Sequence, residues 1–198
     1  SFNRMMQFGG GLRSVGLGDI WQAIIDPIAN ENFEEEHATN NEFGNQLASI
    51  ASRMNFDGEV PFSLYMEYAA EDSTSLEAWK LGNIAFSLGV YVPEITDNLS
   101  VRYEITDRQS SWYINQLYAE GYTNAGNVMG HWSGDQRHIR DNAQAVHQSF
   151  NISWEPVSGQ FADLTLRHVN NSDRSIIDYK RYLGLETRYS WSSAKGFY

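Results

Sequence analysis

The stretch VHQSFNISWEPVSGQFADLTLRHV, residues 146–169, decides the fold class of this chain. Its first half alternates between two faces, one with Val146, Gln148, Phe150, Ile152 and Trp154 and the other with His147, Ser149, Asn151 and Ser153. After a break at 155–159 the second half alternates again, with Ala162, Leu164, Leu166 and His168 opposite Asp163, Thr165 and Arg167. A period of two is that of a β-strand, so the stretch predicts a hairpin with one apolar and one polar face.

Two architectures accommodate such a hairpin. A soluble β-sandwich buries the apolar face against a second sheet, whereas an outer-membrane barrel turns that face to lipid and encloses the polar one. The charges on the polar face, and the aromatic residues Trp154 and Phe161 beside the break, favour the barrel. The sandwich is the alternative, because alternation by itself fits both.

The composition argues against several classes of protein. No apolar run in the 198 residues approaches the roughly 18 that a membrane helix needs. Alternation hides an apolar face from any average, so the mean hydropathy of −0.48 does not argue against a barrel. The lack of cysteine removes disulfides and thiolate metal sites. The formal charge of −11 argues against nucleic acid as a partner, because a phosphate backbone requires a basic face.

Period-two alternation recurs along the rest of the chain. It predicts strands at 46–56, 62–70, 81–92, 99–106 and 182–191, and a looser one at 2–9. Short connections, at 55–60, 93–98, 155–160 and 192–196, alternate with long ones, as periplasmic turns alternate with external loops in bacterial barrels. Aromatic residues lie beside these short connections, as an interfacial girdle requires: Phe56, Phe62, Tyr91, Trp154, Phe161 and Trp191.

We therefore predict an all-β fold, an antiparallel up-and-down transmembrane β-barrel of which this chain is a fragment of about eight or nine strands. Residues 1–198 form one partial outer-membrane barrel domain, with external loops at about 10–42, 109–144 and 170–180. A short helix is expected in the first loop, at 17–29, with Asp19 as its N-cap.

The polar faces of the predicted strands collect charges of both signs that would face the barrel lumen. They are Arg53, Glu67, Arg102, Glu104, Asp163, Arg167, Glu186 and Arg188. Pairing neighbouring charges lowers the cost of desolvating each of them, so we expect a structural ion-pair network. A selectivity lining for a diffusing solute is the alternative.

The long loop at 109–144 combines aromatic rings with amides and a carboxylate, which is what a saccharide site needs. Ring faces stack on the C–H patches of sugars, while amides and carboxylates bind hydroxyl groups. The candidate polysaccharide-binding residues are Trp112, Tyr113, Tyr118, Tyr122, Asn124, Trp132 and Asp135. The alternative is that these rings pack the loops into a lid.

Two further groups of residues could suggest a metal site or a catalytic site. His131, Asp135, His138 and Asp141 match no metal-ligand spacing, so neither a metal nor another cofactor is expected. His147 and Ser149 share a face two residues apart and suggest an outer-membrane phospholipase. Both side chains are predicted to face the interior rather than lipid, so we expect no enzymatic activity.

Several segments, in chain order, resemble the capsule-assembly outer-membrane family of Wzi type. They are QFGG at 7–10, GDIW at 18–21, EFGNQLA at 42–48, PFSLY at 61–65, ED at 71–72 and EGYTNAGNVMGH at 120–131. The likeness runs in order over about residues 4–173, which makes it more specific than any single segment.

The resemblance implies a bacterial outer-membrane protein with a non-enzymatic role. Proteins of this family hold capsular or related surface polysaccharide at the outer membrane as lectin-like anchors during capsule assembly, in a larger barrel of which this chain would be the C-terminal half. The implied partners are surface polysaccharide and outer-membrane lipid, and the full-length barrel is expected to be a monomer. A porin-like passive channel is the first alternative, and the phospholipase with His147 and Ser149 the second.

Overall fold

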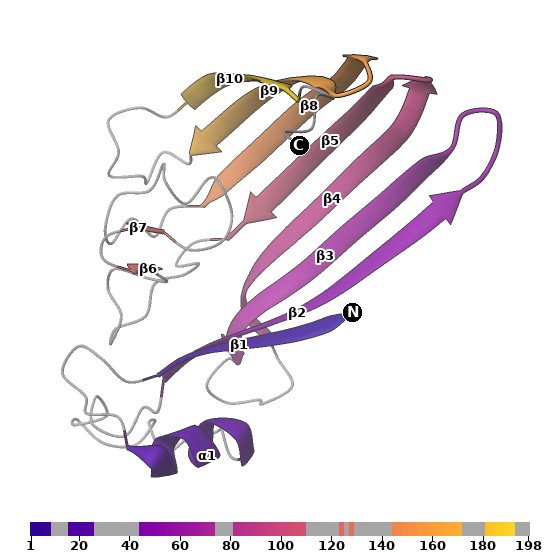
Figure 1. Ribbon diagram of the computed structural model, residues 1–198. Helices are drawn as coiled ribbons and strands as arrows, with labels where there is room; N and C mark the ends of the chain where they lie inside the picture. Colours follow the sequence, from indigo (N-terminus) through magenta and orange to yellow (C-terminus); the bar gives the residue numbers. More distant parts are fainter. Residues whose placement is uncertain are drawn as a thin grey trace, which may run out of the picture.

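The computed structural model describes residues 1–8, 16–25, 44–73, 81–109, 123–124, 127–128, 144–171 and 181–192. Eight antiparallel strands form one sheet in the order β1-β2-β3-β4-β5-β8-β9-β10 (Figure 1). Their bounds are β1 Phe2–Phe8, β2 Gly44–Phe56, β3 Phe62–Ser73, β4 Leu81–Thr96, β5 Leu99–Arg108, β8 Ala145–Val157, β9 Gln160–Asn171 and β10 Arg181–Trp191. Two short strands, β6 Thr123–Asn124 and β7 Asn127–Val128, pair with each other.

The sheet has the up-and-down topology that the alternation predicts. Each strand pairs with the next one along the chain, apart from the small β6-β7 hairpin that lies between β5 and β8 in sequence. The edge strands β1 and β10 do not pair with each other among the described residues, so the sheet is open. The predicted fold class is confirmed: the chain is all-β, and its open sheet is consistent with a fragment of a barrel.

The connections also follow the predicted pattern. Short turns join β2 to β3, β4 to β5 and β8 to β9, at 57–61, 97–98 and 158–159. The connections at the other end of the sheet, 9–43, 74–80, 109–144 and 172–180, are longer in every case. The sheet therefore has one end with tight turns and one end with long loops.

Two strands run further than the sequence predicts, because each contains a proline at a bulge. The stretches 93–98 and 155–160 were both expected to be connections, yet β4 continues to Thr96 and β8 to Val157. The pairing register shifts between Val92 and Thr96, and again between Trp154 and Val157. Proline has no N–H to donate and is tolerated at such irregularities. The β8-β9 turn itself is reduced to 158–159, where Gly159 has a φ of 84° that favours glycine.

The helix α1, Leu17–Ile25, lies in the connection between β1 and β2, where a helix was expected. Its start differs from the prediction, because Asp19 lies inside the first turn rather than at the N-cap. The Asp19 carboxylate accepts a hydrogen bond of 2.6 Å from the Gly16 N–H, and the Asp19 N–H donates to the Gly16 carbonyl at 3.2 Å. These two bonds form a reciprocal cap like that of a capping box. No helix in the described part of the chain is long and apolar enough to cross a membrane.

The register keeps most of the large apolar side chains on one face of the sheet. One row of paired residues crosses seven strands on the apolar face, namely Met54, Leu64, Val90, Tyr103, Phe150, Leu166 and Leu185. A parallel row crosses the polar face, namely Arg53, Tyr65, Gly89, Glu104, Ser149, Arg167 and Gly184. Both faces match the sequence prediction at every one of these positions.

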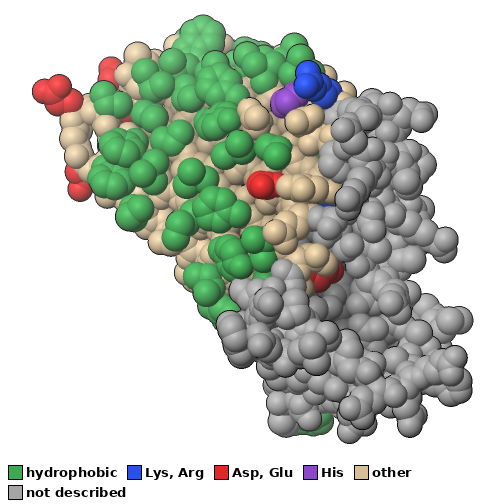
Figure 2. All heavy atoms as spheres, turned by 180° about the vertical axis from the view of Figure 1, so that it is seen from behind, with side chains coloured by type: hydrophobic (Ala, Val, Ile, Leu, Met, Phe, Trp, Pro, Cys, Tyr) green, Lys and Arg blue, Asp and Glu red, His purple; other side chains and the backbone are tan. Residues whose placement is uncertain are grey.

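Burial in the described residues is the reverse of that in a soluble protein. Large apolar side chains are exposed, with Leu183 at 75 % and Trp191 at 70 % of their full accessibility. Polar side chains are buried instead, among them Arg108 and His147. Figure 2 shows apolar side chains spread over one face of the sheet. No second sheet or helix layer among the described residues covers that face.

Close packing on the polar face depends on Gly89. The Tyr65 ring crosses strand β4 above this glycine, and the Tyr65 hydroxyl donates to Glu104 Oε2 on β5 at 3.0 Å. A Cβ atom at position 89 would overlap the Tyr65 ring. Because Gly89 has no side chain, Tyr65 of β3 can cross β4 and reach Glu104 of β5.

We expect Gly89→Ala to lower the free energy of unfolding by about 1–3 kcal/mol, because the ring must move and the bond to Glu104 is lost. Gly58→Ala is the matched control, since nothing lies within 4 Å of an added Cβ in that exposed turn. Denaturant titration of both variants measures the difference. Equal stability of the two variants would contradict the packing role of Gly89.

Candidate functional site on the polar face

The polar face is the surface that carries chemistry in the described residues. All eight charged residues predicted for the lumen lie on this face, at Arg53, Glu67, Arg102, Glu104, Asp163, Arg167, Glu186 and Arg188. Their arrangement separates them into groups that contact one another and groups that do not.

One group is an ion-pair cluster at the β9-β10 end of the sheet. Arg167 Nη2 lies 3.0 Å from Glu186 Oε2, and Arg188 Nη2 lies 3.5 Å from Glu186 Oε1. Glu186 therefore compensates two guanidinium groups that flank it, one across the strand pair and one along its own strand. Each of these side chains is more than a third exposed, so the contribution to stability is small.

A second group surrounds Tyr91. The guanidinium carbon of Arg102 lies 4.9 Å from the centre of the Tyr91 ring, and that of Arg53 lies 5.8 Å from it. Both distances are within the range of a cation–π contact. Tyr91 pairs with Arg102 and Phe161 pairs with Ser190, both on the polar face, so their places in the predicted girdle are wrong. The girdle prediction considered only how near a residue lies to a turn. The face on which a side chain lies depends instead on whether its position in the strand is odd or even.

Hydrogen bonds between neighbouring strands fill the space between the ion pairs. Asn151 donates to Thr165 Oγ1 at 2.9 Å, Ser153 donates to Asp163, and Ser87 and Thr106 share a bond of 2.8 Å. Glu67 lies on the same face between its register partners Ala51 and Ser87. The described wall is thus joined by hydrogen bonds between neighbouring strands at least as much as by ion pairs.

A buried pair lies where β5 and β8 approach the long loops. Arg108 Nε donates to His147 Nε2 at 2.9 Å, and the two residues are 4 % and 1 % exposed. A hydrolase would need this imidazole nitrogen to accept the proton of a nucleophile such as Ser149. Its lone pair is already occupied by Arg108, so the geometry gives no support to the phospholipase interpretation.

Most of the predicted polysaccharide-binding residues lie outside the described residues. These are Trp112, Tyr113, Tyr118, Tyr122, Trp132 and Asp135. Asn124 belongs to β6, where its backbone pairs with Asn127. His131, Asp135, His138 and Asp141 are likewise outside, and the residues that are described contain no group of three possible metal ligands.

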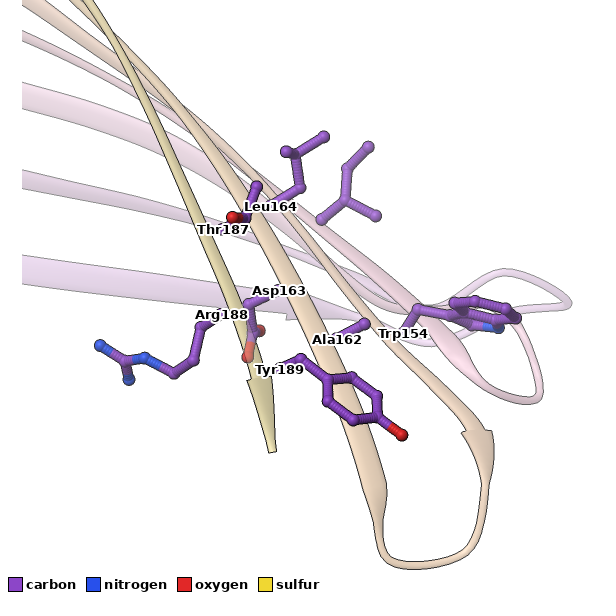
Figure 3. Close-up of a pocket in the computed structure, with 8 residues that line it drawn as sticks. Trp154, Ala162, Asp163, Leu164, Thr187, Arg188 and Tyr189 are labelled. Carbon is purple, nitrogen blue, oxygen red and sulfur yellow. The ribbon is translucent and has the colours of Figure 1, made fainter. Parts of the chain in front are cut away.

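The apolar face contains one feature that sequence reasoning missed. A groove of about 360 Å³ lies near the short turns, where Ala162 separates Trp154 from Tyr189 in one register row. Figure 3 shows the two rings on either side of Ala162, with Arg188 pointing to the opposite face. The sequence contains all three residues, but only strand pairing places Ala162 between the two aromatic rings.

The family of the chain is decided by a comparison with known protein families. A family model described as "Capsule assembly protein Wzi" matches residues 1–141. This chain belongs to the Wzi capsule assembly family. The match covers more than two thirds of the 198 residues and confirms the resemblance seen in the sequence.

Strands β8, β9 and β10 lie beyond the matched part of this Wzi family chain. They nevertheless continue the same sheet, because β8 pairs directly with β5 over ten consecutive residue pairs. No curated protein and no solved structure matched the chain in the other comparisons. The family assignment therefore depends on the family model.

We expect Arg108→Ala to lower the free energy of unfolding by about 1–3 kcal/mol, because the buried His147 Nε2 loses its donor. Arg188→Ala is the control on the same face. Its side chain is 72 % exposed, and its removal should cost no more than about 0.5 kcal/mol. Denaturant titration of both variants measures the two costs. A loss at position 108 as small as that at position 188 would show that the buried pair does not stabilise the loop end.

Proposed function

We propose that this chain forms part of an outer-membrane β-barrel that binds and anchors capsular or related surface polysaccharide without catalysing a reaction. Membership of the capsule assembly family supports the capsule role. The observation that carries the membrane location is the reversed burial, with apolar side chains outside and polar ones inside. Exposed apolar surface of this extent is typical of a membrane or protein contact.

The strands have the length that a membrane crossing needs. A tilted transmembrane strand requires about 9–11 residues. Strands β8 and β9 contain 13 and 12 residues, and β4 contains 16. The residues beyond the membrane would then carry the polar turns and loops.

The edge of the apolar face crosses the strands obliquely, which supports a tilted arrangement. One row of paired residues at the loop end runs across the sheet from β2 to β10. It is apolar in β2 to β4 but polar at most positions from β5 to β10. Its members, in that order, are Ile50, Tyr68, Phe86, Asp107, Val146, Asn170 and Arg181. At the turn end the apolar face extends to Trp191 on β10. Strands of a barrel are tilted by about 35–45°, so a membrane boundary must cut across the rows in this way.

Aromatic rings mark the turn end as one interface. Phe56 and Phe62 stack on each other with ring centres 4.6 Å apart, and Trp154 and Trp191 are both exposed on the apolar face. In bacterial barrels the short turns face the periplasm and the longer loops face outward. We therefore place the loops at about 10–42, 109–144 and 170–180 at the cell surface.

Polysaccharide binding is assigned to the loop at 109–144. Its aromatic and amide residues would stack on sugar rings and bind hydroxyl groups, and no catalytic group is required for anchoring. Partners are surface polysaccharide and outer-membrane lipid, the full-length barrel acts as a monomer, and nucleic acid is not a partner.

A passive channel is the second candidate function, favoured by exposed charges on the polar face such as Glu67 and Arg102. Polysaccharide binding without conductance across a planar bilayer separates the anchor from the channel.

The membrane location is tested by two neighbouring substitutions. We expect Leu164→Arg to cost about 2–4 kcal/mol, because the charge would face lipid. Thr165→Arg should be much milder, because position 165 is on the polar face and pairs with Glu186. Folding into lipid vesicles under denaturant titration measures both. Equal tolerance of the two changes would rule out the proposed lipid-facing side.

The polysaccharide site is tested by removing rings from the loop. We expect Trp112→Ala and Tyr122→Ala each to weaken binding of the native capsular polysaccharide about three- to tenfold, which corresponds to about 0.5–1.5 kcal/mol for a stacking contact. Trp191→Ala at the opposite end is the control and should leave affinity unchanged. Isothermal titration with the full-length protein measures the affinities, and retention of capsule on cells gives a second readout. Wild-type affinity in both loop variants would exclude the loop site.

A further inference from the structure

We propose that Arg53 and Arg102, held on either side of Tyr91, form a binding site for the carboxylate of an acidic sugar unit. The proposal rests on the proposed function, because it takes the ligand to be a polysaccharide. It adds a chemical class of ligand, a uronic acid type sugar, and a second place for it, on the polar face near the short turns and apart from the loop at 109–144.

The site is defined by its geometry across four neighbouring strands, β2 to β5. Arg53 is on β2, Tyr91 on β4 and Arg102 on β5, and the two guanidinium carbons lie 5.8 Å and 4.9 Å from the ring centre. Tyr91 pairs directly with Arg102 in the register, and Ser63 of β3 pairs with Tyr91 on the other side. The ring therefore acts as a spacer that holds two cations close to each other.

This pair lacks an ion-pair partner among the described residues, which distinguishes it from Arg167 and Arg188 on the same face. Arg167 and Arg188 share Glu186, and Arg108 contacts buried His147. Within the described part of the chain, no carboxylate forms an ion pair with Arg53 or Arg102. Two cations near one another on the polar face attract an anion, as rings of arginine do in anion-selective pores.

Arg53 is held in place before a ligand arrives. It donates to Asn55 Oδ1 at 3.2 Å and to Ser63 Oγ at 2.9 Å, and Ser63 in turn donates to Asn55. Side chains that are already ordered lose less entropy on binding, which increases affinity. Both arginines remain exposed, so their outer N–H groups are accessible.

The chemistry of the two groups selects a carboxylate. A guanidinium presents a planar fork of donors that matches the two oxygens of a carboxylate, and such bonds are about twice as strong as neutral ones. A neutral sugar would gain hydroxyl contacts but not this charge-assisted pair. The site should therefore discriminate between an acidic sugar and its uncharged ester.

The test uses tetragalacturonate and its methyl ester as matched probes, with the full-length protein in detergent. We expect wild-type protein to bind the acid at least tenfold more tightly than the ester, and its affinity for the acid to fall as salt rises. Arg53→Gln combined with Arg102→Gln should remove this preference. Arg188→Gln, on the same face but paired with Glu186, should keep it.

A second variant tests whether a loss of binding results from misfolding. Arg102→Lys keeps the positive charge but lacks the planar fork, so it should weaken binding of the acid with an unchanged melting temperature. Unchanged affinity of the double variant for the acid overturns the proposed site, whether or not the melting temperature falls. The two arginines would then have a structural role only. Equal wild-type affinity for acid and ester also overturns the site. Failure of the full-length protein to bind any native capsular polysaccharide would instead refute the proposed function.

Discussion

The whole structure depends on one constraint, the strand register that keeps the polar and apolar faces of the eight-stranded sheet apart. Side chains alternate between faces along each strand, so a slip of one residue in any pair would exchange the apolar and polar faces of every strand beyond it. From β2 to β10 no such exchange occurs. The two register shifts lie beside the short turns, at Pro93 and Pro156, where few residue pairs follow them.

That constraint gives the molecule two surfaces with different chemistry. The apolar surface presents exposed leucine and aromatic side chains and a groove floored by Ala162. On the polar surface the charges are not uniform along the wall. Near β10, Glu186 compensates its arginines, whereas near β4 Tyr91 separates two arginines that lack such a partner in the described residues. The polar surface is therefore charge-compensated near β10, whereas near β4 it carries two guanidinium groups with no carboxylate partner in the described residues.

The sequence predicted the strands, their faces and the alternation of short and long connections, because each of these follows from local patterns. The predicted connections at 93–98 and 155–160 were too long, because in each of them a bulge accommodates a proline and the strand continues. Tyr91 was assigned to the girdle from its nearness to a turn, and Asp19 to the N-cap from its residue type. In both cases the position of the neighbouring residues in space decided the outcome.

The sequence by itself determined the family, through motifs in order over the chain, and the two-faced character of the strands, through their period of two. The tertiary structure alone decided which side chains meet. Arg167 reaches Glu186, and Tyr65 reaches Glu104 across Gly89, because strand pairing brings together residues that are well separated in the chain. Composition shows that arginines are present, but only the register decides which of them is neutralised and which retains its charge.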